Sequence, residues 1–513
     1  MSTLHAIFEN HLNDKTAIVV PRSCKVPCRI SYRQLYQLIQ DFACQLQNAM
    51  TGAGRQPGQA VAIAYPNSIE FVVGFLGAGL MQLVAAPLNP AYTKDEFIFY
   101  LDDSKASVLI VPPGSIRQHT PAVQAAHERN VQVLELFFDG QRLHLTPNRP
   151  LSAAAPVRFS PKPQDVTLLL HTSGTTGRPK GVPLSHVNLA TSMKNIVSTY
   201  ELNAKDCTLL VMPLFHVHGL ICGLLASLYS GASVVIPEKF SASQFWSDFG
   251  DNQCNWYTAV PTIHQILLRQ PPRHVPHIRF IRSCSSSLAP ATLHALEATF
   301  KAPVLEAYAM TEAAHQMTSN PLPKHGAHKP GSVGLGQGVE VVILNDKGAP
   351  VDEGEVCIKG SNVTRGYLNN PTATAEAFTQ DGYFRTGDQG KKDKDGYLIL
   401  TGRIKELINR GGEKISPLEV DAALLAHPNV AEAVCFGVPD DMYGQEVHAA
   451  IVLKSGSTSE KDLQDFVVKK LAKFKVPKRI YFTNQLPKTG TGKIQRRKMV
   501  DVFFKPQPLQ AKL

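Results

Sequence analysis

A loop rich in glycines and hydroxyl groups follows a short apolar run. Val166 to Leu170 form that run, which predicts a buried strand. In the loop, glycine backbone can turn N–H groups toward an anion, and hydroxyl and cationic side chains can donate to its oxygens. This combination predicts a phosphate cradle built from Thr172, Ser173, Gly174, Thr175, Thr176, Gly177 and Lys180. A Walker-type loop is excluded by Arg178-Pro179, and a flexible surface loop is the plain alternative.

Composition places the chain among ordinary globular proteins. It has 513 residues, 43% of them hydrophobic and 18% charged. Because single cores stop growing at about 250–300 residues, we expect more than one compact unit. The net charge of +10 suits polyanionic ligands such as ATP or coenzyme A, although a solvated basic surface explains it equally well. Zinc-finger spacing and arginine-rich tracts are missing from the sequence, so nucleic acid is not an expected partner.

The cysteines and the apolar segments indicate the redox compartment of the chain and whether it spans a membrane. Nine scattered cysteines, with only Cys24 and Cys28 close together, predict neither a disulfide ladder nor a metal array and favour a reducing compartment. The N-terminus has no basic-then-apolar signal pattern. The apolar stretch from Leu76 to Leu88 is short and interrupted by Gln82 and Pro87, so we expect a core helix running into a strand and no membrane span.

Alternating helical and extended patterns predict an α/β fold. Strands spaced by helical patterns in residues 1–160 favour a parallel sheet, and frequent glycines between 330 and 400 favour a β-rich subdomain. The C-terminal 110 or so residues suffice for a small α+β domain. The expected strands are 61–64, 84–88, 108–111, 209–212, 234–236, 280–281, 430–437 and 449–453, and the expected helices are 31–50, 68–75, 186–200, 419–425 and 463–471.

The glycine-rich loop resembles the phosphate-binding signature of the adenylate-forming superfamily of acyl-CoA synthetases, coumarate ligases, luciferases and adenylation domains. Further stretches resemble it in the same order, so the resemblance covers nearly the whole chain. It implies an α/β fold in which residues 1–402 form a large N-terminal domain of doubly wound sheets with a β-barrel-like subdomain. A hinge at 403–405 and a small mobile α+β domain at 406–513 complete the implied organisation.

The resemblance also implies an ATP site between these domains. Tyr308 would stack on adenine beside Glu306 and Ala307, Thr311 would reach the α-phosphate, and Glu312 would bind Mg²⁺ as a hard oxygen ligand. Asp388 would accept hydrogen bonds from the ribose hydroxyls, with Arg403 as a second anchor; taken alone, an Asp in a glycine-rich turn is commonplace.

Lys493 occupies the position of the catalytic lysine, where a cation would stabilise charge as a carboxylate attacks the α-phosphate. Without the family, a lysine in a Gly-Thr-Gly loop would be read as solvated. Lys405 lies where the family has its hinge. After rotation, coenzyme A would meet Arg410, Gly411, Gly412, Lys414 and Lys475, although a solvated basic face is an open alternative for the lysines.

Polar residues at the expected acyl pocket indicate a small dicarboxylate. Many superfamily members have glycine where this chain has Ala309, beside Met310, and the added methyl would narrow the acyl tunnel. His216, His218, Ser285 and His315 suit a second carboxylate better than an apolar tail. His216 also gates the carboxylate entrance in the family, and His315 could be a satisfied core or capping residue.

The strings 282–290, 305–315 and 402–417 closely resemble oxalyl-CoA synthetases of plants and fungi. The implied function is an ATP- and Mg²⁺-dependent oxalate–CoA ligase that forms oxalyl-AMP and then oxalyl-CoA. The alternatives are a medium-chain fatty-acid or 4-coumarate-type CoA ligase, a luciferase-like oxygenase and a non-enzymatic nucleotide-binding scaffold. The terminal Ala511-Lys512-Leu513 resembles a peroxisomal address, so the expected location is the peroxisome, reached through the import receptor, and otherwise the cytoplasm.

Overall fold

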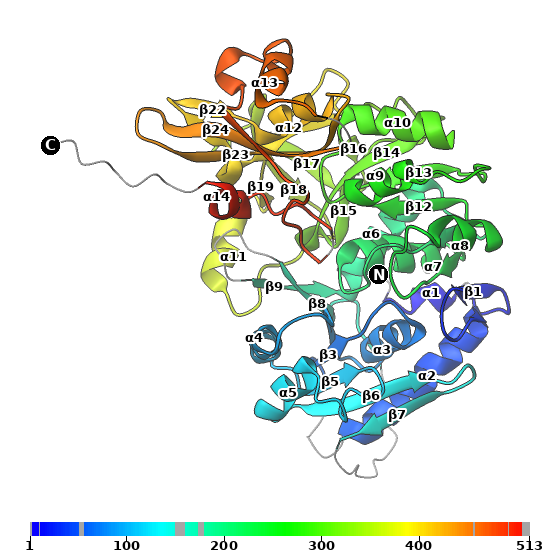
Figure 1. Cartoon of the computed structure of the whole chain (residues 1–513). Helices are drawn as coiled ribbons and strands as arrows, with labels where there is room; N and C mark the ends of the chain where they lie inside the picture. The colour runs from blue at the N-terminus through cyan, green and yellow to red at the C-terminus, as the bar shows by residue number, and fades with distance from the viewer. Residues whose placement is uncertain are drawn as a thin grey trace.

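The structure, a computed structural model, describes residues 3–9, 11–50, 56–148, 160–172, 179–454, 457–490 and 492–504. In that part of the chain the strands form four sheets; in Figure 1 the N-terminal sheet lies at the bottom and the C-terminal sheet at the top, with the other two between them. Two predictions lie outside the described residues: the loop residues Ser173 to Gly177 and the terminal Ala511-Lys512-Leu513.

The lower sheet confirms the parallel α/β pattern predicted for the N-terminal part. Its order is β7-β6-β5-β3-β4-β8-β9, parallel through the interior and antiparallel at both edge pairs. The helix that follows β3 is capped by Ser68, whose hydroxyl accepts from the N–H of Phe71 at 3.2 Å. The strands of the lower sheet are β3 (Ala60–Ala64), β4 (Val84–Leu88), β5 (Val108–Val111), β6 (Gln132–Phe138), β7 (Leu143–Pro147), β8 (Val166–Thr172) and β9 (Lys180–Ser185).

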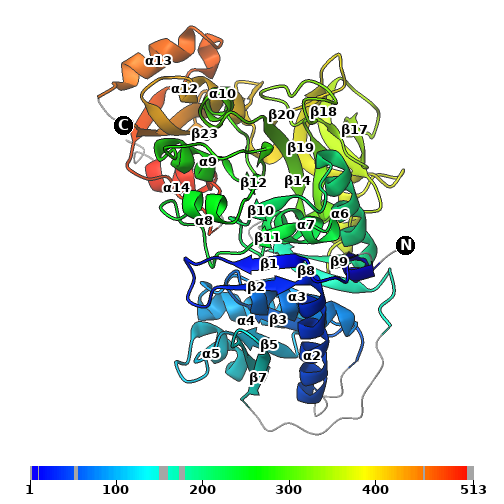
Figure 2. The ribbon, with the colours of Figure 1, turned by 90° about the vertical axis from the view of Figure 1, so that its right-hand side faces the viewer.

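Helices cover both faces of this sheet because its strands are apolar on both sides. The long α2 and the apolar α3 lie side by side (Figure 2). Helix α3 ends at Leu80 and β4 begins at Val84, which confirms a core helix running into a strand. No helix in the described ranges has the length and apolar character that crossing a membrane requires. These helices are α2 (Tyr32–Met50), α3 (Ile69–Leu80), α4 (Lys94–Ser104) and α5 (Pro121–Glu128).

The central sheet has nine strands in the order β16-β15-β14-β13-β12-β10-β11-β1-β2. Its far edge comes from the start of the chain, because β1 pairs in parallel with β11. Residues 1–160 therefore contribute to two sheets, which the sequence pattern did not predict. The strands of the central sheet are β1 (Thr16–Val20), β2 (Cys28–Ser31), β10 (Cys207–Leu209), β11 (Ser233–Val235), β12 (Trp256–Ala259), β13 (Phe280–Ser283), β14 (Val304–Met310), β15 (His315–Ser319) and β16 (Leu335–Gly336).

Strand β10 begins two residues before the predicted position, and its pairing ends early. The Leu210 N–H still donates to the Val235 carbonyl at 2.9 Å, but the chain then turns toward Pro213. Helix α6 matches the prediction, with a capping box between Ser185 and Asn188. The helices of this layer are α1 (Ala6–Glu9), α6 (His186–Tyr200), η2 (His218–Leu225, a π-helix), α7 (Ala226–Tyr229), α8 (Phe245–Asp251), α9 (Pro261–Arg269), α10 (Pro290–Phe300) and η3 (Thr311–Ala313).

The predicted β-rich subdomain is a four-stranded antiparallel sheet, β17-β18-β19-β20, with β17 and β20 at its edges. It packs its apolar face against Tyr308 and Met317 of the central sheet. Its strands are β17 (Glu340–Leu344), β18 (Glu353–Lys359), β19 (Phe384–Lys392) and β20 (Leu398–Arg403), and helix α11 (Pro371–Ala377) lies between β18 and β19.

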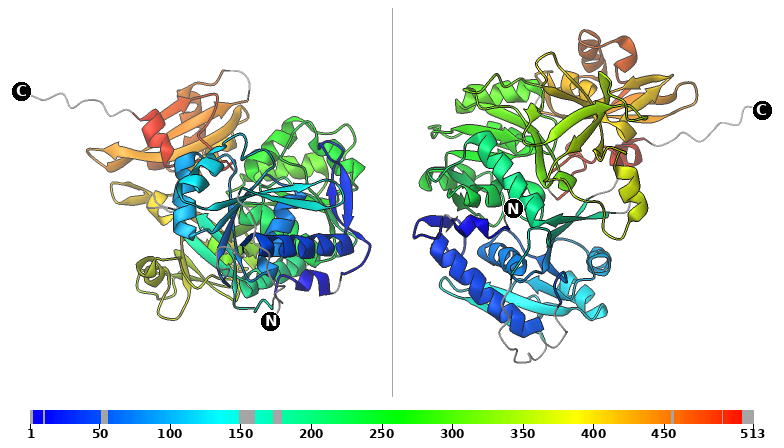
Figure 3. Two further views of the ribbon diagram at one scale, coloured as in Figure 1. Left: turned by 90° about the horizontal axis from the view of Figure 1, so that it is seen from below. Right: turned by 180° about the vertical axis from the view of Figure 1, so that it is seen from behind.

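The C-terminal α+β part has its own apolar core and lies to one side of the two large sheets (Figure 3). The connection from β20 is short, since η4 (Ile404–Glu406) leads directly into the new sheet. The hinge at 403–405 and the domain limits on either side of it remain predictions. The sheet is β22 (Glu413–Ile415), β21 (Ile408–Arg410), β24 (Gly444–Leu453) and β23 (Val430–Asp440), with β25 (Arg479–Phe482) beside β24; its helices are α12 (Pro417–Leu425), α13 (Glu460–Val468), η5 (Lys473–Lys475) and α14 (Lys498–Phe503).

Candidate active site

A cavity of about 460 Å³ lies between the central sheet, the end of β20 and the C-terminal part of the chain. It forms where parallel strands β12 to β14 end, the usual position of ligand sites in α/β sheets. The predicted site residues in its wall come from three separate regions of the sequence. They are Ser285, Glu306, Ala307, Tyr308, Ala309, Met310, Asp388, Arg403 and Lys493.

Asp388 is held in the wall by two donors. The Tyr308 hydroxyl donates to its carboxylate, and Arg403 Nε lies 3.3 Å from the other carboxylate oxygen. Asp388 and Arg403 face each other because they are register partners on β19 and β20. Burial, together with the Asp388 charge, keeps the pKa of Tyr308 well above its ordinary value, so the phenol stays protonated. The result is a fixed carboxylate that can accept hydrogen bonds from ligand hydroxyl groups.

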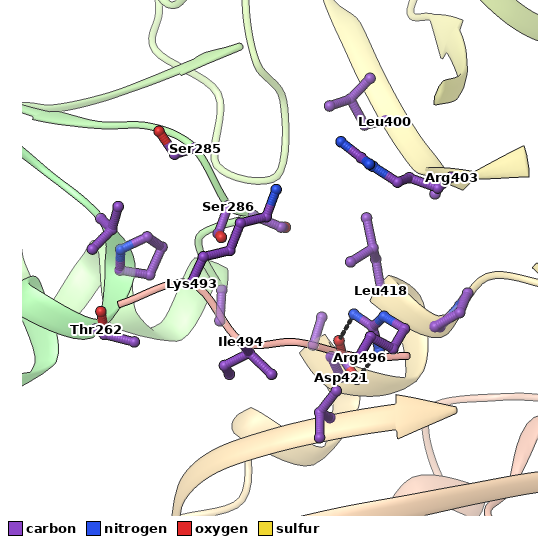
Figure 4. Close-up of a pocket in the computed structure, with 18 of the residues that line it drawn as sticks. Thr262, Ser285, Ser286, Leu400, Arg403, Leu418, Asp421, Lys493, Ile494 and Arg496 are labelled. Atoms are coloured by element: carbon purple, nitrogen blue, oxygen red, sulfur yellow. Dashed lines mark hydrogen bonds and ion pairs between the residues drawn. The ribbon is translucent and has the colours of Figure 1, made fainter. Parts of the chain in front are cut away.

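Lys493 extends into the same cavity from the C-terminal part. Its amino group points between the Ser285–Ser286 loop and Arg403 (Figure 4). The loop is attached at the Gly492 carbonyl, which accepts from Thr262 Oγ1 at 3.2 Å. Protein surrounds the lysine although it remains open to the cavity. Desolvation lowers the pKa of Lys493, as does the Arg403 charge, while Asp388 and Glu406 act in the opposite sense. Lys493 therefore places a cation in the cavity, on the same side as Arg403.

His216 lies next to Lys493 but outside the cavity wall. Burial lowers the pKa of His216 to about 4, and the positive charge of Lys493 contributes. The imidazole is thus neutral at pH 7. Its Nδ1 accepts from the backbone N–H of His218 at 3.3 Å, which leaves the ring hydrogen on Nε2.

Glu312, Thr311 and Lys180 are not among the residues that line the cavity. The Tyr367 hydroxyl donates to Glu312 Oε1 at 3.0 Å, and Lys180 Nζ lies 4.5 Å from the centre of the Tyr367 ring. Burial raises the pKa of Glu312, with Arg403 and Lys180 opposing that shift. Thr172 and Lys180 are register partners on β8 and β9, so the two ends of the predicted phosphate loop are adjacent.

Glu306 is a buried acid with one free oxygen at the cavity. Its Oε1 accepts from the Leu288 N–H at 2.9 Å, and Oε2 has no partner among the described residues. Burial raises the pKa of Glu306 to about 8, so it carries a proton at pH 7.

A buried polar cluster lies behind Ser285, and only part of it was predicted from the sequence. Arg282 is fully buried, and its guanidinium donates to three neutral groups: Tyr200 Oη at 2.7 Å, Thr258 Oγ1 at 3.3 Å and Gln316 Oε1 at 3.2 Å. A buried cation without an acid beside it is costly unless an anion binds nearby. The signal available in the sequence was the charge itself, because Arg282 directly follows the apolar residues Phe280 and Ile281 in strand β13.

The two histidines of the cluster are stacked. The rings of His218 and His315 lie 5.2 Å apart with an angle of 24° between their planes. Both ring nitrogens of His315 are buried, and in the described part of the chain neither has a hydrogen-bond partner. His315 also has a φ of +90°, which is unusual for a side chain of its size. The ring is therefore neither a cap nor a satisfied core residue.

The predicted coenzyme A residues lie outside the cavity. Arg410 pairs with Glu446, with Nε 2.5 Å from Oε1, and its guanidinium stacks 4.0 Å from the Tyr443 ring centre. Lys475 pairs with Glu419 at 2.6 Å. Gly411 and Gly412 form the exposed turn between β21 and β22, and Lys414 is exposed on β22. Lys405 lies within η4 and is likewise outside the cavity wall.

The metal expectation can be tested on the donors present. The described residues contain no group of three or more His, Cys, Asp or Glu that could hold a metal ion by themselves. Glu312 supplies one carboxylate, which fits an ion that takes its other oxygen ligands from a bound nucleotide and water, as Mg²⁺ commonly does.

Comparison with known proteins agrees with this geometry. The oxalate–CoA ligase of Arabidopsis thaliana is 51% identical over 488 residues, which cover 93% of this chain and 94% of that protein. The oxalate–CoA ligase of Saccharomyces cerevisiae is 49% identical over 532 residues, 98% of this chain and 97% of that protein. The structure of ATP-bound MatB from Rhodopseudomonas palustris superimposes with a TM-score of 0.86 at 29% identity, over 98% of this chain and 99% of that one.

Two family profiles match the sequence. The AMP-binding enzyme profile matches residues 6–368, and the profile of the AMP-binding enzyme C-terminal domain matches residues 419–493. Since the first match alone covers well over half of the sequence, this chain belongs to the AMP-binding enzyme family.

Proposed function

We propose that this chain is an AMP-forming acid–CoA ligase and that its acid is oxalate. The observation that carries the choice of acid is the buried cation Arg282, which lies with His218 and His315 directly behind Ser285. A pocket for an alkyl or aromatic tail would be lined with apolar groups at this point. A second carboxylate fits instead, because it supplies the missing negative charge and accepts hydrogen bonds.

In the first half-reaction, an oxalate oxygen attacks the α-phosphorus of ATP, and the bond to pyrophosphate breaks. Lys493 stabilises the charge that develops on the phosphoryl oxygens. Tyr308 and the neighbouring Glu306 and Ala307 hold the adenine, and Asp388 with Arg403 holds the ribose. Thr311 and the loop from Thr172 to Lys180 bind phosphate oxygens.

Mg²⁺ would be held by Glu312 and the phosphates, where it would neutralise charge on the leaving pyrophosphate. The buried Glu312 is kept in place by the Tyr367 hydroxyl at 3.0 Å. Neutral His216, beside Lys493, can gate the carboxylate entrance without adding a charge of its own.

In the second half-reaction, the coenzyme A thiol attacks the acyl carbon, AMP leaves and the thiol proton passes to solvent. Arg410, Gly411, Gly412, Lys414 and Lys475 lie away from the cavity, so they can serve only after a rearrangement. We propose that the C-terminal part rotates about Lys405 to bring them to the adenylate.

The acid is tested by pyrophosphate release with oxalate, malonate, succinate, hexanoate and coumarate, each with ATP and coenzyme A. Oxalate should give the highest kcat/KM, at least about 10-fold above those of hexanoate and coumarate, because the Ser285 hydroxyl and the buried polar cluster behind it suit a carboxylate better than an apolar tail. A preference for hexanoate or coumarate would favour the alternative of a medium-chain fatty-acid or coumarate-type ligase and end the oxalate proposal. A luciferase-like reaction would appear as light without dependence on coenzyme A, and a nucleotide-binding scaffold as the lack of turnover with every acid.

The proposed location is the peroxisome, reached through the import receptor for Ala511-Lys512-Leu513. The resemblance of this tripeptide to the peroxisomal address supports it. A fluorescent fusion at the N-terminus should collect in peroxisomes and become cytoplasmic when the last three residues are removed. An unchanged distribution would overturn the proposal.

A further inference from the structure

Four side chains form a continuous line of hydrogen bonds from the core to the cavity. Arg282 Nη1 lies 3.3 Å from Thr258 Oγ1, and the same oxygen lies 2.6 Å from His218 Nε2. On the other side of the ring, His218 Nδ1 lies 3.0 Å from Ser285 Oγ. Arg282, Thr258 and His218 are buried, and Ser285 is the member that faces the cavity.

The charge at the inner end sets the direction of the first hydrogen bond. A guanidinium can only donate, so Thr258 Oγ1 accepts from Arg282. The single hydrogen of the Thr258 hydroxyl is then available for another acceptor. His218 Nε2 at 2.6 Å is the strong acceptor within reach, whereas a thiol such as that of Cys222 is a weak one.

The ring transmits this direction to Ser285. A histidine buried beside Arg282 and stacked on His315 is neutral, and burial keeps the pKa of His218 well below its ordinary value. A neutral imidazole that accepts at Nε2 carries its hydrogen on Nδ1. Nδ1–H therefore donates to Ser285 Oγ, and the Ser285 hydroxyl hydrogen is left to point toward the cavity.

We propose that Thr258 is a positioning residue that fixes the Nδ1–H tautomer of His218 and thereby makes Ser285 a hydrogen-bond donor to the second carboxylate of the substrate. This inference rests on the proposed function. With the opposite tautomer, Ser285 would donate to His218 and present only lone pairs to the cavity. Those lone pairs would repel an anion, so the tautomer decides whether the pocket accepts a dicarboxylate.

The kinetic experiment compares three single substitutions of buried threonines. Thr258→Val removes the hydroxyl and should raise KM for oxalate by on the order of 10-fold, the effect of one hydrogen bond to a charged group, with KM for ATP within about twofold. Thr258→Ser keeps the hydroxyl and should restore the wild-type KM. Thr208→Val is the matched control, because Thr208 is also fully buried on the neighbouring strand and its hydroxyl has no partner in the described ranges.

A double-mutant cycle separates this mechanism from a general packing effect. If Thr258 acts through Ser285, then Thr258→Val should change KM by less than about twofold in a Ser285→Ala background. Equal losses in both backgrounds would mean that Thr258 acts through packing and would overturn the proposal.

The tautomer itself can be observed without any activity. In ¹⁵N-histidine-labelled protein, two-bond ¹H–¹⁵N correlations distinguish Nδ1–H from Nε2–H, and the signal of His218 is the one lost in His218→Gln. We expect Nδ1–H in the wild type, and finding Nε2–H there would overturn the inference even if Thr258→Val failed to fold. A wild-type enzyme that ignores oxalate would end the proposed function, whereas oxalate turnover with an unchanged KM in Thr258→Val would end this inference alone.

Discussion

Thr262 Oγ1 donates a 3.2 Å hydrogen bond to the carbonyl oxygen of Gly492, which precedes Lys493. Thr262 lies in the first turn of α9 in the central layer, whereas Gly492 belongs to the C-terminal part of the chain. The bond therefore links the loop that carries Lys493 to the wall that holds the residues proposed to bind the nucleotide.

Removing this link should affect adenylate formation more than the later step. In Thr262→Val, the Gly492 carbonyl loses a donor, and we expect kcat for pyrophosphate release to fall by about 3- to 10-fold, the effect of one neutral hydrogen bond. Thioester formation from supplied oxalyl-AMP should remain within twofold. Thr262→Ser serves as the control, and a similar loss in both half-reactions would contradict the assignment.

Lys493→Ala tests the fixed cation. Because one preorganised donor to a developing charge is typically worth about 10²–10³ in rate, adenylate formation should fall by that factor. Thioester formation from oxalyl-AMP should survive, since the proposed mechanism uses Lys493 at the phosphoryl centre only in the first step. The exposed Lys454→Ala is the matched control. Equal loss of the two half-reactions would exclude two separate arrangements of the C-terminal part.

Ala309→Gly should relax the choice of acid. Ala309 lines the cavity beside Met310, and deleting its methyl group makes room for one more methylene in the substrate. We expect the ratio of kcat/KM for malonate to that for oxalate to rise by about 10-fold. Ala302→Gly, in the core away from the cavity, reports the cost of a glycine to the fold. An unchanged ratio would mean that Ala309 does not limit the length of the acid.

His186 should make stability depend on pH below 7. It is fully buried, its Nδ1 accepts from the Leu4 N–H at 3.2 Å, and desolvation lowers the pKa of His186 to about 4. In the unfolded chain His186 binds a proton near pH 6.5. The part of the free energy of unfolding that depends on neutral His186 is therefore present at pH 7. It is lost as pH falls from about 6.5 to 4.

Urea unfolding at pH 7 and pH 5 measures that share. In His186→Gln, the difference in unfolding free energy between the two pH values should shrink by up to about 2 kcal/mol relative to the wild type, because the titrating ring is gone. His294→Gln, at an exposed position, should leave the difference unchanged. An unaltered pH dependence in His186→Gln would refute the assignment of the titration to this ring.

Helices and strands could be predicted from the sequence where the hydrophobic spacing and the capping residues indicate the same element. Helix α6 follows its Ser185 cap, and β3 to β5 follow their apolar runs, so these elements could be predicted from the sequence. Joining β1 to β11 is a contact between distant segments, and no local pattern specifies it. The same reason explains why residues 1–160 were assigned to one sheet.

The residues of the candidate site likewise fall into those that a local sequence pattern predicts and those that it does not. Asp388, Tyr308 and Lys493 stand in short motifs and were predicted, whereas Thr262, Thr258 and Tyr200 are single residues in ordinary helices and strands. Their importance comes only from what lies opposite them, such as the guanidinium of Arg282 against Tyr200 Oη at 2.7 Å. Arg282 could have been added to the predicted residues of that cluster, because a charge directly after the apolar residues Phe280 and Ile281 indicates a buried cation that needs partners.

The hydrogen bond from Tyr308 to Asp388 bears on how a nucleoside is admitted. The carboxylate is already held in place before any ligand arrives, and its remaining lone pairs can still accept from a sugar hydroxyl. Because the acceptor is fixed in advance, little conformational freedom is lost when the hydroxyl donates to it. The Asp388 contact therefore selects for a sugar whose hydroxyl lies in one position.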